Sequence, residues 1–130
     1  MNILKKLIEW FEKHKKISFV FLLIILGIMT YFSSIPGSTI SFGSIWPSII
    51  YHATIFAGFA FFLLAVFVNK KIESKNIILT ILISLFVAIL DEIHQSFVPL
   101  RGPGLEDVAI DLIGAILSIS LYYLVKKNFH

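Results

Sequence analysis

Three side chains in the second half of the chain have the types and the spacing of groups that do chemistry. Asp91 and His94 stand three residues apart, which places a carboxylate and an imidazole about one turn apart on a helix. Asp111 follows on a separate apolar segment and would complete either a base–orienter pair or a metal site. We therefore take Asp91, His94 and Asp111 as candidate catalytic residues.

A metal site is an alternative interpretation of the same three residues. Carboxylate oxygen and imidazole nitrogen suit Zn²⁺, Mn²⁺ or Mg²⁺. The sequence has no complete metal-ligand signature, however, and no cysteine that would supply a thiolate. It therefore predicts no cofactor and no set of metal ligands, and a divalent metal stays an open alternative.

Neighbouring polar residues would supply a ligand site with hydrogen bonds and charge. Arg101 is suited to holding an anion through two parallel hydrogen bonds, whereas Glu106 and Asp107 also suit the first turn of a helix. A purely structural role is the alternative, with Asp91 bonded to Gln95 or His94 and Asp111 paired with Arg101 or His52. The predicted ligand-binding residues are His52, Asp91, Glu92, His94, Gln95, Arg101, Asp107 and Asp111.

The setting of these residues is strongly apolar. The chain has 130 residues, of which 58% are apolar, and a mean hydropathy of +0.92, which indicates a membrane protein rather than a soluble domain. Ten lysines, one arginine and eight acids give a net charge of +3. Because the positions of these charges fit a membrane topology, we predict no nucleic-acid partner.

Four apolar segments are long enough to cross a bilayer as helices. They predict an all-α, polytopic membrane protein, a bundle of four transmembrane helices in one domain over residues 1–130. Residues 1–16 are amphipathic and would either lie on the inner leaflet or extend the first span into water. The predicted spans are about 17–34, 48–68, 77–97 and 105–125.

Basic residues predict the orientation. Ten of the eleven lysine and arginine residues fall before the first span, between the second and third, or after the fourth, and Arg101 is the exception. Since basic loops stay in the cytoplasm, both termini should be cytoplasmic, and the loop around Arg101 should face outside.

Helical periodicity indicates where the polar groups meet. An ionisable group at the centre of a bilayer costs about 2.5 to above 10 kcal/mol, so such groups face the bundle interior or a wet cavity. Asp91 and His94 share one face of the third span with Thr80, Ser84, Val87, Ala88 and Gln95, and Asp111 shares one face of the fourth with Asp107, Gly114 and Ser118. We expect Asp91, His94, Asp111 and His52 to converge in one outward-facing cavity, roughly 8–10 Å below the outer helix ends.

Three segments carry a family resemblance. The stretch "DEIHQSFVPLRGPGLEDVAIDLIGAI" resembles the closing motif of the VanZ-like membrane protein family, "HATIFAGF" resembles its histidine followed by phenylalanines, and "SSIPGS" resembles a segment after its first span. The resemblance implies a small multi-pass protein of the bacterial cytoplasmic membrane. The member that names the family is associated with low-level resistance to the glycopeptide teicoplanin, and no catalytic residue is carried over.

Three functions remain open at this point. The first is a cell-envelope protein whose outer cavity binds a lipid head group, a lipid-linked precursor or a lipoglycopeptide, with membrane lipids as its surroundings. The second is an enzyme acting on a lipid-linked substrate. The third, a proton-coupled transporter, fits less well because the inner halves of the third and fourth spans carry only Thr80, Ser84 and Ser118 as polar groups. The sequence predicts no oligomeric state.

Overall fold

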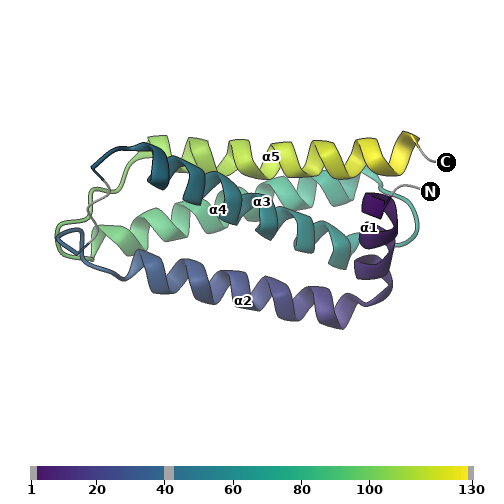
Figure 1. Ribbon diagram of the computed structural model, residues 1–130, viewed down its shortest axis with the longest axis horizontal. Helices are drawn as coiled ribbons and strands as arrows, with labels where there is room; N and C mark the ends of the chain where they lie inside the picture. The colour runs from purple at the N-terminus through teal and green to yellow at the C-terminus, as the bar shows by residue number, and fades with distance from the viewer. Residues whose placement is uncertain (1–2, 40–42, 129–130) are drawn as a thin grey trace.

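The structure is a computed structural model that describes residues 3–39 and 43–128. These residues form five helices and no strand, which confirms the predicted all-α bundle (Figure 1). The helices are α1 (Ile3–Lys13), α2 (Lys15–Ser33), α3 (Trp46–Phe67), α4 (Ser74–Ser96) and α5 (Leu105–Asn128).

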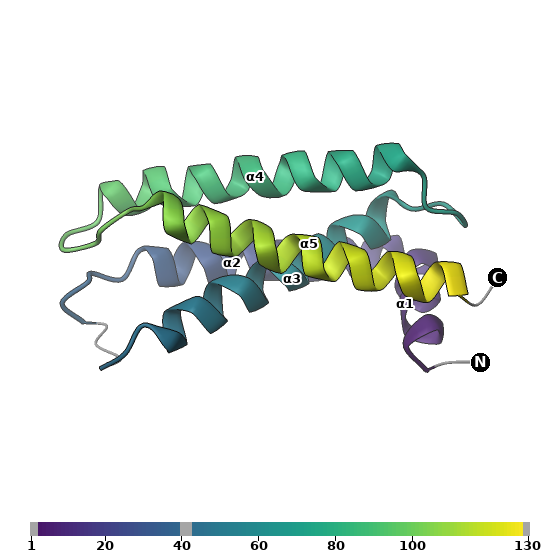
Figure 2. The same cartoon turned by 90° about the horizontal axis from the view of Figure 1, so that it is seen from above.

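The four longer helices have the length and composition to cross a membrane, and they run along the long axis of the molecule (Figures 1 and 2). Each begins and ends within three residues of the predicted span. Large apolar side chains such as Leu23, Phe86 and Leu117 are exposed on their outer faces. Such exposure is expected where acyl chains rather than water surround the protein.

Local signals explain where the spans begin. Pro47 lies in the first turn of α3, where its missing N–H leaves no hydrogen bond unmade. α4 begins at Ser74, three residues before the predicted start, because Glu73 and Asn76 form a capping box. In that box the Asn76 side chain accepts the backbone N–H of Glu73 at 2.9 Å.

The centre of the bundle is the pair α3 and α5, which share the largest interface and cross each other (Figure 2). Small residues permit this approach. α2 and α4 flank the pair and contact each other much less. The main apolar cluster of buried residues joins α1, α3 and α5 and consists of Ile8, Ala60, Leu64, Val68, Ala115, Ile119, Tyr122 and Val125.

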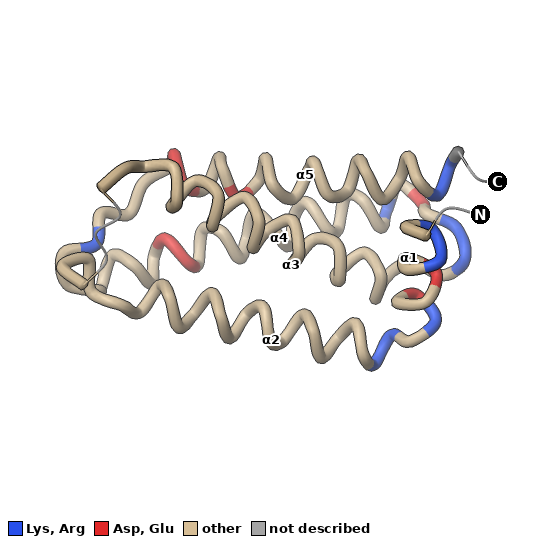
Figure 3. Tube along the Cα trace, viewed as in Figure 1, with Lys and Arg blue, Asp and Glu red and all other residues tan. Residues whose placement is uncertain are grey.

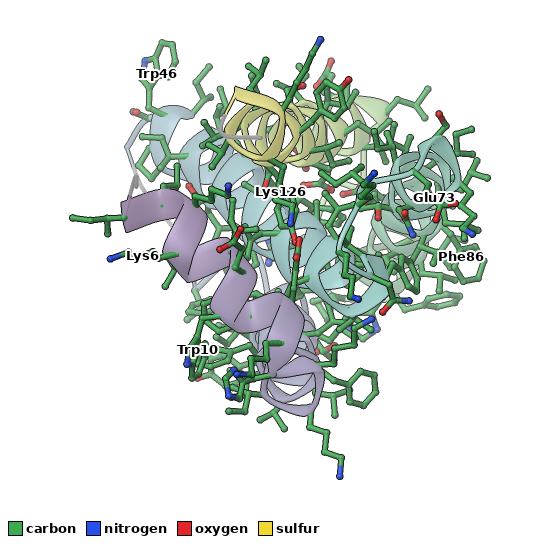
Figure 4. All side chains as sticks on the ribbon, turned by 90° about the vertical axis from the view of Figure 1, so that its right-hand side faces the viewer. Lys6, Trp10, Trp46, Glu73, Phe86 and Lys126 are labelled. Atoms are coloured by element: carbon green, nitrogen blue, oxygen red, sulfur yellow. The ribbon has the colours of Figure 1, made fainter. Side chains whose placement is uncertain are left out.

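α1 is a separate helix that lies across one end of the bundle (Figures 1 and 4). Its Ile8 is buried in the main core cluster, whereas Trp10 points outward. Glu12 accepts hydrogen bonds from the Tyr122 hydroxyl and the Lys126 ammonium group, both at 2.9 Å. Of the two alternatives for residues 1–16, the structure therefore has a docked helix rather than an extension of α2. Its location on the inner leaflet stays a prediction.

Charged residues divide between the two ends of the bundle (Figure 3). All ten lysines lie at the end that carries α1, together with Glu9, Glu12 and Glu73. We call this the lysine end. The opposite end, which we call the acidic end, holds Asp91, Glu92, Arg101, Glu106, Asp107 and Asp111.

Candidate functional site

Three candidate residues lie at nearly equal depth below the acidic end. His52 is six residues after Trp46, which begins α3, and Asp111 is six residues after Leu105, which begins α5. Asp91 is five residues before Ser96, which ends α4. At 1.5 Å per residue each lies about 8–9 Å inside its helix, as the sequence predicted.

His52 and Asp111 form a buried pair between α3 and α5. Their Nδ1 and Oδ1 atoms are 2.8 Å apart, and the Asp111 side chain is completely buried. An ionised carboxylate only accepts hydrogen bonds, so beside it Nδ1 carries the hydrogen and the other ring nitrogen is directed elsewhere. That nitrogen, Nε2, lies 3.9 Å from Asp107 Oδ2. Asp111 thus orients the imidazole, and the ring's second nitrogen is placed toward the half-buried Asp107.

Gly114 makes this pair possible. It is three residues after Asp111 and therefore lies on the same face of α5. A Cβ atom at Gly114 would lie 2.1 Å from the carbonyl oxygen of Ala53, the residue next to His52. Only glycine lets the backbones of α3 and α5 approach so closely, and this approach brings His52 within hydrogen-bond distance of Asp111.

Asp91 belongs to a second polar group, between α2 and α4. Its Oδ1 accepts a hydrogen bond from Ser33 Oγ, and its Oδ2 accepts one from Gln95 Nε2 at 2.9 Å. No cationic group of residues 3–39 or 43–128 pairs with its carboxylate. Nearby, His94 Nε2 lies 3.0 Å from Ser34 Oγ. The end of α2 therefore supplies hydroxyl partners to the end of α4.

A cavity of about 380 Å³ adjoins this second group. Asp91, His94 and Thr30 contribute its polar lining, and the other lining side chains are aliphatic or thioether groups. One surface thus combines a carboxylate, an imidazole and hydrocarbon. We call it the α2–α4 cavity; it is lined by Leu26, Met29, Thr30, Val87, Leu90, Asp91 and His94.

Glu92 has a different environment from Asp91. It is only 8% exposed, and its Oε2 accepts the backbone N–H of Gly104 at 2.8 Å. Its Oε1 is buried without a hydrogen-bond partner among the described residues. The face of α4 that is buried runs through Ser84, Ala88 and Glu92, whereas Asp91 is half-buried and His94 is exposed. The predicted polar face is therefore rotated toward Glu92.

Arg101 holds two loops together. Its Nε donates to the carbonyl of Ile35 at 3.1 Å, and its Nη2 donates to the carbonyl of Phe32 at 2.5 Å. Beside it, the backbone N–H of Gly37 donates to Pro99 at 3.0 Å. A Cβ at Gly37 would overlap the Leu100 carbonyl, so glycine is needed at this crossing. These bonds give Arg101 a structural role, and its predicted anion binding stays a prediction.

A family model described as VanZ/LLP1 matches residues 17–126. The chain belongs to the VanZ/LLP1 family. This confirms the resemblance seen in the sequence. No curated protein and no solved structure matches the chain significantly. The matched residues include nearly all of the four long helices and leave out α1.

In this VanZ/LLP1 chain the four residues expected in one cavity lie in two groups. Asp91 and His94 line the α2–α4 cavity, whereas His52 and Asp111 pair between α3 and α5. His52 and Asp111 are buried and do not line the α2–α4 cavity. Within the described ranges, no three histidine, aspartate or glutamate side chains are grouped so that they could hold a metal ion.

The predicted site lacked Ser33, Ser34 and Tyr51. The two serines bond Asp91 and His94, and their place in "SSIPGS" was the available signal. The Tyr51 hydroxyl is buried without a hydrogen-bond partner in the described part of the chain, and its ring centroid is 5.5 Å from that of His52. Its position beside His52 in the sequence carried no signal of this.

Proposed function

We propose that this VanZ/LLP1 protein acts in the bacterial cell envelope by binding the polar head group of a lipid, lipid-linked precursor or lipoglycopeptide in the outer leaflet. Such binding would lower the access of teicoplanin to its target and give low-level resistance. Family membership supports the proposal, together with four helices long and apolar enough to cross a membrane.

The distribution of basic residues supports an orientation with the lysine end in the cytoplasm. Ten of eleven lysine and arginine residues lie at that end, and short cytoplasmic loops carry an excess of such residues. The acidic end would then face outside. Because the chain has no cysteine, single cysteines introduced at Gly102 and Lys71 report without background. A membrane-impermeant maleimide should label Gly102→Cys in intact cells and leave Lys71→Cys unlabelled, and the reverse pattern would contradict the orientation.

The α2–α4 cavity is the observation that carries the proposal. Its polar residue Asp91 lies about 8 Å inside the helix end, a depth suited to head groups, and hydrocarbon side chains line the rest. A carboxylate at such depth is costly unless it is hydrogen-bonded or functional. The volume of the α2–α4 cavity, about 380 Å³, is within the usual range of ligand pockets.

Drug susceptibility tests the proposal in a strain that depends on this protein. Asp91→Asn combined with His94→Gln removes the charge and the imidazole from the cavity while preserving shape. We expect increased teicoplanin susceptibility. Glu106→Gln is the matched control, because Glu106 is an exposed carboxylate at the same end and lies outside the cavity lining. Unchanged susceptibility of the double variant, at equal protein levels, would refute the proposal.

A second candidate function rests on the His52–Asp111 pair. A buried carboxylate that orients an imidazole is the arrangement of a general base, and Nε2 would accept the proton. An enzyme acting on a lipid-linked substrate would use this pair. Purified protein incubated with a radiolabelled polyprenyl-diphosphate-linked precursor should then convert it, and His52→Gln should lose turnover but retain binding. Equal product with and without the protein would exclude this reaction.

A further inference from the structure

We propose that the α2–α4 cavity takes a phospholipid whose head group ends in a primary ammonium ion. This inference rests on the proposed function and names the class of ligand for the same site. It follows from the charge of the acidic end, from the hydrogen bonds that Asp91 has and lacks, and from the apolar lining of the cavity.

The charge balance around the cavity favours a cation. Five of the chain's eight carboxylates lie at the acidic end. The single arginine there directs two nitrogens at the backbone carbonyls of Phe32 and Ile35. A ligand with only a phosphate group would therefore meet carboxylates, and the arginine side chain would not be directed toward it. An ammonium ion would instead be attracted by the negative charge of the acidic end.

Asp91 has both the position and the remaining capacity to receive an ammonium ion. A carboxylate offers about four lone-pair sites, and Ser33 and Gln95 use one on each oxygen. These two donors fix the carboxylate at the wall of the cavity. No described cationic side chain lies within 4 Å of the Asp91 carboxylate. The ammonium ion of the head group would fill that role and donate a charge-assisted hydrogen bond to Asp91.

The rest of the lining specifies a lipid rather than a small amine. Leu26, Met29, Val87 and Leu90 are apolar, so they would contact glycerol and acyl carbons below the head group. α2 and α4 share little interface, and their outer faces carry exposed apolar residues. A lipid can therefore reach the cavity laterally from the bilayer. His94 adds a hydrogen-bonding group beside the carboxylate.

Native mass spectrometry of the full chain, released from detergent micelles, tests the proposal. The probes are dioleoyl-phosphatidylethanolamine, its N-acetyl derivative, dioleoyl-phosphatidylglycerol and free ethanolamine. We expect phosphatidylethanolamine to bind about ten- to a hundred-fold more tightly than the N-acetyl lipid, because acetylation removes one charge-assisted interaction. Tighter binding of phosphatidylglycerol, or equal binding of free ethanolamine, would overturn the proposal.

Three variants locate the binding. Asp91→Asn should lose the preference for phosphatidylethanolamine, and Glu106→Gln should keep it. Val87→Trp fills the cavity without altering the carboxylate and should weaken binding of every lipid probe. Thermal unfolding in detergent verifies that each variant is folded. A preference that survives both Asp91→Asn and Val87→Trp would overturn the proposal.

The same variants separate this inference from the proposed function. If teicoplanin susceptibility responds to Asp91→Asn with His94→Gln but phosphatidylethanolamine shows no preference, the ammonium lipid is refuted and the envelope role stands. If the lipid preference is present and susceptibility does not respond, the envelope role is refuted and the lipid site stands.

Discussion

Gly114→Ala should separate α3 from α5 and break the His52–Asp111 pair. The added methyl carbon would lie 2.1 Å from the Ala53 carbonyl oxygen, where an ordinary contact needs at least 3.4 Å. The helices must therefore move apart by about 1.3 Å, since backbone cannot rotate away as a side chain can. The same shift would lengthen the 2.8 Å distance between His52 and Asp111 to about 4 Å, beyond hydrogen-bond range.

The free energy of unfolding should fall by about 1–3 kcal/mol, the usual cost of inserting atoms into a packed contact. The costs of the overlap and of the lost hydrogen bond do not add. If the helices move apart, the overlap is relieved and the His52–Asp111 hydrogen bond is lost; if they stay in place, the bond is kept and the overlap remains. Alanine has a higher helix propensity than glycine by about 1 kcal/mol, which offsets some of the loss.

The control for this prediction is Gly27→Ala. Gly27 lies on α2, and a Cβ there meets nothing within 4 Å, so this variant reports the propensity gain alone. Each variant is unfolded in mixed micelles by increasing sodium dodecyl sulfate and monitored by circular dichroism. This gives the free energy of unfolding of Gly114→Ala and of Gly27→Ala. Gly27→Ala should be neutral or slightly stabilising. Equal stability of the two variants would refute the close approach of α3 and α5.

Three further predictions concern other contacts of the structure. Arg101→Lys keeps the charge but cannot reach two carbonyls with a planar fork, so the midpoint of thermal unfolding should fall; a midpoint equal to the wild type would contradict the loop contact. His52→Gln and Asp111→Asn, alone and combined, should give a coupling energy of about 0.5–3 kcal/mol in a double-mutant cycle, and additive effects would show that the pair does not interact. Glu12→Gln leaves Lys126 buried beside a neutral amide, which should cost about 1–3 kcal/mol and speed tryptic cleavage within α1; an unchanged cleavage rate would contradict the docking of α1.

The fold was predictable because its determinants are local. A run of apolar residues of the right length specifies a span, and Pro47 places the beginning of α3 within two residues. The capping box of Glu73 and Asn76 begins α4 three residues before the position that the apolar run predicts. The depth of the polar groups followed from helix geometry alone.

The site was less predictable because it depends on which helices pack together. Asp91 and Glu92 differ by about 100° around α4, and only the position of its neighbours decides which one is buried. The guanidinium group of Arg101 is equally suited to bind an anionic ligand or backbone carbonyls, so the residue type alone does not decide between them. The pairing of Asp111 with His52 was one of two alternatives, and Gly114 decided it through a close approach that no periodicity reveals.

The bond between Glu12 and Lys126 joins residues 114 positions apart in the chain. Because α5 follows the other four helices in the chain, the hydrogen bonds from α5 to Glu12 can form only after those helices have been made. The contacts of α1 with α2 and α3 can form earlier, so the polar attachment of α1 to α5 is added to an apolar one. A chain truncated before Tyr122 would lack both hydrogen bonds to Glu12 and would hold α1 only through its apolar contacts, such as those of Phe11 with Phe61 and Phe62.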